Sequence, residues 1–164
     1  LYLPTHGWSI KGNYFDSPNE NYSKAEIDLR ASQNIRDVIF HGRLYYAGSP
    51  KGRLPAFDPA RIGGFLSMSG FAPNQIYGDS ISFGNVRVEK VVGELPLGLR
   101  GDMRIGFSLE SGKIGSPITE TELNGWQNSL AVYAGGETPL GPVYAGFGYS
   151  PNGMSMVYVF IGTP

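Results

Sequence analysis

Apolar and polar residues alternate along eight short stretches of the chain, and this two-residue period predicts β-strands. In the clearest stretch the apolar positions share one face, with Leu99, Met103, Ile105, Phe107 and Leu109. The opposite face of the same stretch carries charge, with Arg100, Asp102, Arg104 and Glu110. The expected strands cover residues 7–15, 21–31, 35–47, 77–92, 97–110, 126–136, 142–149 and 154–163.

The connections between these strands are alternately long and short. Long connections follow the first, third, fifth and seventh strands and include the segment 48–76, whereas the others are tight turns. Long loops at one end and short turns at the other are typical of outer-membrane barrels, with both termini on the periplasmic side. We therefore predict an all-β, transmembrane antiparallel β-barrel of eight strands, a single domain over residues 1–164, in the bacterial outer membrane.

A soluble barrel or sandwich is the alternative, because periodicity alone does not say which face of a strand is buried. The charges on the polar face favour the membrane barrel, since burying them in a soluble core costs several kcal/mol per ion unless each is paired. Aromatic residues near strand ends are also typical of the interfacial girdles of membrane barrels. These are Trp8, Tyr14, Tyr22, Tyr45, Tyr46, Trp126, Tyr149 and Phe160.

Composition narrows the function classes. The 24 glycines, 12 prolines and 13% aromatic residues favour an all-β chain. A net charge of −1 argues against a nucleic-acid partner. The chain has no cysteine, so disulfides and thiolate metal sites are excluded. It also has no apolar run long enough for a transmembrane helix.

The long connection contains a glycine-rich motif. Residues 62–79 read IGGFLSMSGFAPNQIYGD, and the motif positions are Gly63, Gly64, Met68, Ser69, Gly70 and Phe71. The segment resembles the inward-folding loop of BamA/TamA-type outer-membrane assembly and secretion barrels, the bacterial surface antigen family. The variant is most similar to the C-terminal barrels of outer-membrane patatin-like phospholipases. The resemblance implies a loop that folds into the barrel between the third and fourth strands and plugs it; an ordinary surface loop is the alternative.

The motif departs from the family at one position. Ser69 stands where the family has an arginine, and Glu110 stands where it has the acidic partner of that arginine. The resemblance implies that Glu110 faces the loop, but the usual ion pair cannot form with Ser69. Whether Arg61 substitutes for the arginine is open at this point.

The C-terminal residues resemble the family's terminal assembly signal, a glycine followed by alternating large apolar residues. The matching positions are Gly153, Met156, Tyr158 and Phe160. This resemblance implies that the barrel-assembly machinery is a partner during insertion. It also implies that the chain corresponds to the last eight strands of a sixteen-stranded barrel.

The function follows from size and resemblance. A closed eight-stranded barrel has an interior just wide enough for side chains, leaving little room for a plug loop. We therefore predict a homodimer surrounded by outer-membrane lipid, built from two half-barrels or from two small closed barrels paired at their first and last strands. This dimer is expected to act as a pore or a translocation and assembly module. The alternative is a passive membrane anchor for a fused or partner enzyme.

No residues suggest catalysis or a cofactor. The chain has no Gly-x-Ser-x-Gly nucleophile motif, and its two histidines are a weak ligand set. His41 is interpreted as a hydrogen-bonded wall residue, with a general base as the less favoured alternative. A row of charges either sets the ion preference of the lumen or forms cross-strand pairs. Its members are Arg87, Glu89, Arg100, Asp102 and Arg104.

Overall fold

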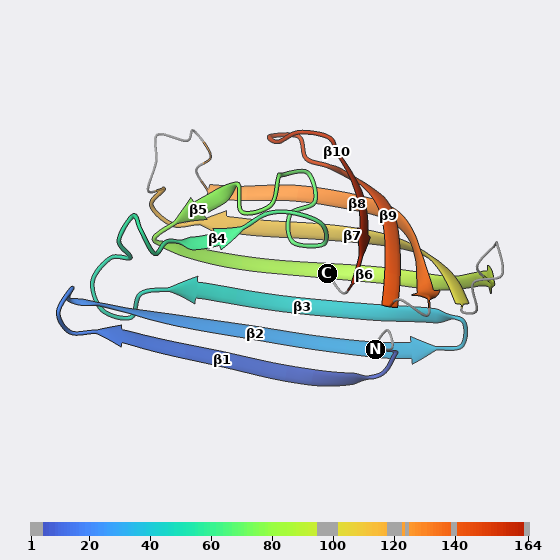
Figure 1. The fold of residues 1–164 in the computed structure, drawn as a ribbon, viewed down its shortest axis with the longest axis horizontal. Coiled ribbons are helices and arrows are strands. Elements are labelled where there is room, and N and C mark those ends of the chain that lie inside the picture. The colour runs from blue at the N-terminus through green and yellow to red at the C-terminus, as the bar shows by residue number, and fades with distance from the viewer. Residues whose placement is uncertain (1–4, 95–101, 118–122, 124, 139–140, 163–164) are drawn as a thin grey trace.

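The protein is an all-β chain in the computed structural model, which describes residues 5–94, 102–117, 123, 125–138 and 141–162. Eight strands form one antiparallel sheet and two short strands form a second one (Figure 1). The described residues include no helix that is long and apolar enough to cross a membrane. The strands are β1 (Gly7–Ser17), β2 (Tyr22–Ile35), β3 (Val38–Gly48), β4 (Ala60–Ile62), β5 (Ile76–Gly78), β6 (Ser80–Glu94), β7 (Asp102–Ile114), β8 (Gly125–Thr138), β9 (Gly141–Tyr149) and β10 (Met156–Ile161).

The large sheet is a meander in which each strand pairs with its neighbour in the chain, in the order β1-β2-β3-β6-β7-β8-β9-β10. The small hairpin of β4 and β5 lies within the connection from β3 to β6. Strands β1, β3, β7 and β9 end at one end of the sheet, called here the loop end. Strands β2, β6 and β8 end at the other, the turn end (Figure 1). The predicted order of eight antiparallel strands is confirmed.

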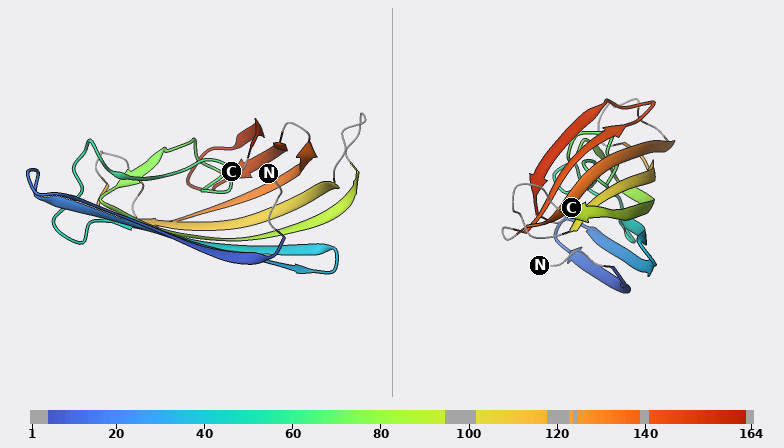
Figure 2. Two further views of the ribbon diagram at one scale, coloured as in Figure 1. Left: turned by 60° about the horizontal axis from the view of Figure 1, so that its bottom comes forward. Right: turned by 90° about the vertical axis from the view of Figure 1, so that its right-hand side faces the viewer.

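The sheet is open. Its edges are β1 and β10, and these two strands do not pair with each other. The sheet curls into a trough, and the connection between β3 and β6 lies on its concave side (Figure 2). We call this connection, residues 49–79, the interior loop. The open sheet therefore does not confirm the prediction of a closed barrel.

Strand boundaries differ from expectation most clearly at β7. The sequence predicted a strand over 97–110, whereas β7 runs from Asp102 to Ile114, and residues 95–101, with Leu99 and Arg100, lie outside the described residues. The strand continues past Glu110 because the alternation persists, and Ile114 pairs with Ile81 on the buried side. Near the turn end, the register of the pairing between β6 and β7 shifts between Val91 and Gly93.

The two faces of the sheet have opposite character. On the convex face, large apolar side chains are exposed on strands from one edge of the sheet to the other. For example, the cross-strand partners of Phe107 are Val88 on β6 and Val132 on β8. Prominent members are Ile10, Ile27, Leu44, Val86, Ile105, Leu109, Phe147 and Val157. The concave face carries most of the ionised residues of the sheet and is partly covered by the interior loop (Figure 2). The cross-strand registers therefore bring the apolar positions of neighbouring strands to the same face of the sheet.

The aromatic residues near strand ends divide between the faces. Tyr14, Tyr46, Trp126 and Tyr149 are exposed on the convex face near the loop end, and Trp8 is exposed near the turn end. Two others were wrongly grouped with them.

The exceptions are Tyr22 and Tyr45, which point to the concave side. Tyr22 is buried against the interior loop and donates a hydrogen bond to Asp58 over 3.1 Å. Tyr45 lies beside Arg43, whose guanidinium carbon is 5.4 Å from the ring centroid. Position near a strand end did not reveal which face each ring occupies, because that depends on strand parity.

Candidate functional site

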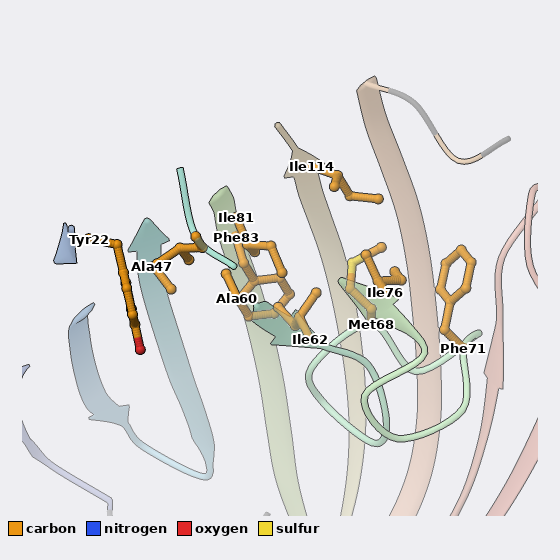
Figure 3. Close-up of a cluster of buried hydrophobic side chains, with 11 residues drawn as sticks. Tyr22, Ala47, Ala60, Ile62, Met68, Phe71, Ile76, Ile81, Phe83 and Ile114 are labelled. Atoms are coloured by element: carbon orange, nitrogen blue, oxygen red, sulfur yellow. The ribbon is translucent and has the colours of Figure 1, made fainter. Parts of the chain in front are cut away.

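The interior loop packs on the concave face through apolar side chains (Figure 3). Its buried contributors include Ile62, Met68, Phe71 and Ile76. The sheet supplies the other side of the cluster, with Ala47 from β3, Ile81 and Phe83 from β6 and Ile114 from β7. Burying a side chain of this size contributes about 1.5–3 kcal/mol, so the loop is held as part of the core.

Ser69 and Glu110 meet at the centre of the interface between loop and sheet. The Ser69 backbone N–H donates to Glu110 Oε2 over 2.5 Å, and the Ser69 hydroxyl donates to Oε1 over 2.8 Å. Ser108, on the same strand as Glu110, donates to Oε1 over 3.1 Å. Both Ser69 and Glu110 are buried. The carboxylate is therefore satisfied by three hydrogen bonds in place of an ion pair.

Arg61 takes no part in this contact. It lies on β4, where its Cα partner is Tyr77, and its side chain is exposed. The hydrogen bonds to Glu110 that the described residues provide come from Ser69 and Ser108. Arg61 therefore does not substitute as the partner of Glu110, and Ser69 contacts this acid directly.

The loop is also tied to the last strands of the sheet. The backbone N–H of Gly70 donates to Ser129 Oγ over 2.6 Å, and its carbonyl accepts from the Met154 N–H over 2.8 Å. The Tyr158 hydroxyl, on β10, lies 3.0 Å from the Ser69 carbonyl oxygen and 2.8 Å from that of Phe71, to which it donates.

Close approach explains the glycines of the motif. Gly63 and Gly64 adopt φ values of 137° and 104°, which L side chains rarely adopt. At Gly70 an added Cβ would overlap the backbone of Ser150. The loop therefore lies against the wall at a distance that only glycine permits.

An aromatic group covers the turn-end side of the loop. The Phe65 ring lies 5.3 Å from that of Tyr133, 5.9 Å from that of Tyr144 and 5.4 Å from that of Tyr158. The pair with Tyr133 is edge-on and the other two are tilted. Aromatic pairs add about 0.5–1.5 kcal/mol beyond their area burial. Phe65 thus fixes the loop against β8, β9 and β10.

Part of the predicted charge row forms a buried cluster around Glu89. Arg87 Nε lies 3.4 Å and Arg104 NH1 3.5 Å from the carboxylate, and His41 Nε2 lies 3.5 Å from it. The Tyr133 hydroxyl donates to Glu89 Oε1 over 2.8 Å. The Glu89 carboxylate, which is 1% exposed, therefore contacts three basic side chains.

The other residues of that row lie elsewhere. Asp102 is exposed at the start of β7, opposite Glu94, and Arg100 lies outside the described residues. His41 contacts the Ser32 hydroxyl through Nδ1 at 2.7 Å, as well as Glu89. These contacts make His41 a wall residue of the concave face. Among the described residues, no group of three or more His, Cys, Asp or Glu side chains could hold a metal ion.

The positions of the assembly signal occupy the last strand and the turn before it. The Gly153 N–H donates to the Ser150 carbonyl within that turn. Met156 and Tyr158 pair with Gly148 and Gly146 of β9, and Phe160 pairs in the backbone ladder with Tyr144. On its other side β10 has no neighbouring strand.

Sequence reasoning missed a basic cavity on the concave face. It has a volume of about 360 Å³ and lies between β1, β2, β3, β6 and the loop residues Leu66 and Ser67. Its cationic side chains are Lys11, Arg30, Arg43 and Arg87. Their parity on paired strands was the available signal, but it requires the register between strands to be known.

Three comparisons with known proteins found no match, whether with family models, with curated proteins or with solved structures. The geometry of the two faces of the sheet is therefore the basis for assigning a function.

Proposed function

We propose that this chain forms part of an outer-membrane β-barrel of the bacterial surface antigen superfamily, which acts as a pore or a translocation and assembly module. The interior loop is its lumen plug. The convex face contacts lipid, and the concave face lines the lumen.

The observation that carries this proposal is the inverted distribution of side chains. Val157 and Val159 are each 76% exposed and Ile105 is 51% exposed on the convex face, whereas Glu89 and Glu110 are buried on the concave face. Soluble monomers rarely expose contiguous apolar patches larger than a few hundred Å². Lipid removes the cost of this exposure, and a polar lumen suits the opposite face.

The open edges support a larger barrel. Lipid offers no hydrogen-bond partner, so the outer backbone groups of β1 and β10 need further strands. The interior of an eight-stranded barrel is filled by side chains alone, and here the concave side already holds the interior loop. A second copy that adds its eight strands would satisfy both requirements, as a homodimer surrounded by outer-membrane lipid. The barrel-assembly machinery would insert it by pairing with an exposed edge strand.

A passive anchor for a fused or partner enzyme is the second candidate. It is favoured by the fixed state of the loop, whose backbone at Ser69 and Gly70 is bonded to three different strands. A plug that never leaves the lumen would seal the barrel and leave it with an anchoring role only.

The test is conductance across planar bilayers of the refolded protein, with a variant in which residues 61–76 are replaced by a Gly-Ser linker of equal length. Discrete openings of the unaltered protein would support a pore. A silent protein whose linker variant conducts steadily would support the anchor. If neither conducts and the protein stays folded in plain buffer without lipid, the membrane assignment is wrong.

A further inference from the structure

We propose that the basic cavity on the concave face binds a phosphate monoester. The cavity is lined by residues of β1, β2, β3 and β6. Ser67 of the interior loop lines its other side. All of its residues belong to one chain, so the inference does not require a closed barrel or a second copy.

The cavity has an excess of positive charge. Lys11, Arg30, Arg43 and Arg87 line it, and no carboxylate does. Two carboxylates that do not line the cavity contact these cations. Asp28 bonds both Arg30 and Arg43, and Glu89 is shared by Arg87, Arg104 and His41. The four cations that line the cavity therefore exceed these two carboxylates by two, before either lining histidine is protonated.

Two arginines are placed directly opposite one another in the sheet. Arg30 is the cross-strand partner of Arg43. Directly opposed like charges destabilise a sheet. An anion between these strands would turn that repulsion into attraction.

Donors in the cavity are available. Within the described part of the chain, Lys11 has no ion pair, and the buried Nε of Arg87 has no hydrogen bond, with Glu89 Oε1 no nearer than 3.4 Å. Hydrogen bonds fix the orientation of Arg43. Its Nε and NH2 each donate to the Asp28 carboxylate over 2.9 Å, and its NH1 donates to Ser67 Oγ over 2.9 Å. The walls are thus already arranged to receive an acceptor-rich group.

The charge and size select the ligand class. A phosphate monoester carries a charge of about −1.5 to −2 at neutral pH and three acceptor oxygens, which matches an excess of two cations better than a carboxylate does. A volume of about 360 Å³ accommodates the phosphate and a small attached group. The monoester comes either from a soluble metabolite or from the headgroup of a lipid.

The experiment measures binding to the folded protein in zwitterionic micelles by calorimetry at low ionic strength, with inorganic phosphate and glycerol 3-phosphate as soluble probes. In a second arm, the probe is phosphatidic acid in phosphatidylcholine vesicles. Saturable binding that weakens with added salt is expected. Soluble probes that bind as tightly as phosphatidic acid would identify a soluble ligand, and preference for phosphatidic acid would identify a lipid headgroup.

Two variants tie the binding to the cavity. Lys11→Gln removes an exposed cation that forms no salt bridge within the described residues, and Arg87→Gln removes a partly buried one; each should weaken binding about tenfold. Lys113→Gln, which removes an exposed lysine at the loop end of β7, should leave it unchanged. No saturable binding by the folded protein, or equal losses in all three variants, would overturn the site while leaving the bilayer test of the proposed function unaffected.

Discussion

The side chain of Glu110 on β7 joins the interior loop to the sheet. Its two oxygens accept from the Ser69 backbone, the Ser69 hydroxyl and the Ser108 hydroxyl, all in a buried setting. A serine has no charge to offer the acid, but its backbone N–H and hydroxyl together satisfy both oxygens. Hydrogen bonds to a charged acceptor contribute about 1.5–3 kcal/mol each, so these contacts hold the loop against the wall.

Glu110→Gln should loosen this contact. The amide keeps the size of the side chain but carries no charge, so the hydrogen bonds from the Ser69 N–H and from the two serine hydroxyls lose their charge assistance, which costs about 1–3 kcal/mol. We expect a lower free energy of unfolding in urea and faster proteolysis within residues 62–72. The control is Glu94→Gln, at the exposed end of β6, which should change neither. Equal behaviour of the two variants would contradict the role given to Glu110.

Gly148→Ala should push the loop away from β9. An added Cβ at Gly148 would overlap the backbone of Ser69, whereas at Gly42 it would meet nothing within 4 Å. Overpacking of this kind costs about 1–3 kcal/mol. Gly148→Ala should therefore lower the urea midpoint and expose the loop to protease, and Gly42→Ala should do neither. A Gly148→Ala variant as stable as Gly42→Ala would show that the loop does not rest on this strand.

At the scale of elements, the sheet is a set of strands with one apolar and one polar face, held in phase by register. β8 illustrates this, since Trp126, Leu130 and Val132 point to the convex side while Gln127 and Ser129 point to the concave side. Exposed valine and leucine at these positions are costly in water and favourable in lipid.

Val132→Arg therefore separates a membrane strand from a soluble one. Val132 lies at the middle of β8 and is 46% exposed. In a bilayer the arginine costs about 2–4 kcal/mol at mid-depth, whereas on an exposed soluble surface it costs almost nothing. Asn128→Arg, on the same face but nearer the loop end, is the matched control with a cost of about 0–1 kcal/mol. Unfolding from vesicles measures both; equal small effects would place the convex face in water.

At the scale of the whole molecule, the open sheet has two unpaired edges and a half-filled trough. A homodimer would place β1 of one copy beside β10 of the other, in an antiparallel pair that continues the sheet. The chain has no cysteine, so introduced pairs report on this contact without background.

The double variant Ile10→Cys with Val159→Cys tests the edge pairing. Both residues are exposed, on β1 and β10 respectively. With a short bifunctional maleimide we expect a covalent dimer on denaturing gels. A faster-migrating monomer would instead reveal a closed eight-stranded barrel. The pair Val86→Cys with Val159→Cys, which places one cysteine on the central strand β6, should give no dimer.

The sequence determined the local properties of this protein. The number and order of strands, their antiparallel sense and the segregation of apolar from charged positions all follow from a two-residue period and from the turns between strands. Phe107 and Leu109 lie on the exposed face of β7, as the alternation predicted. The unusual length of the connection between β3 and β6 was equally visible.

Only the tertiary structure decided which residues meet. The contact of Tyr158 with the loop joins positions 89 residues apart, and the spacing of residues along the chain does not encode such a contact. The selection of Arg104 but not Asp102 as a neighbour of Glu89 likewise depends on how β7 is paired with β6. The openness of the sheet was also decided at this level, because closure depends on how strand twist and curl accumulate over all eight strands, whereas alternation describes each strand by itself.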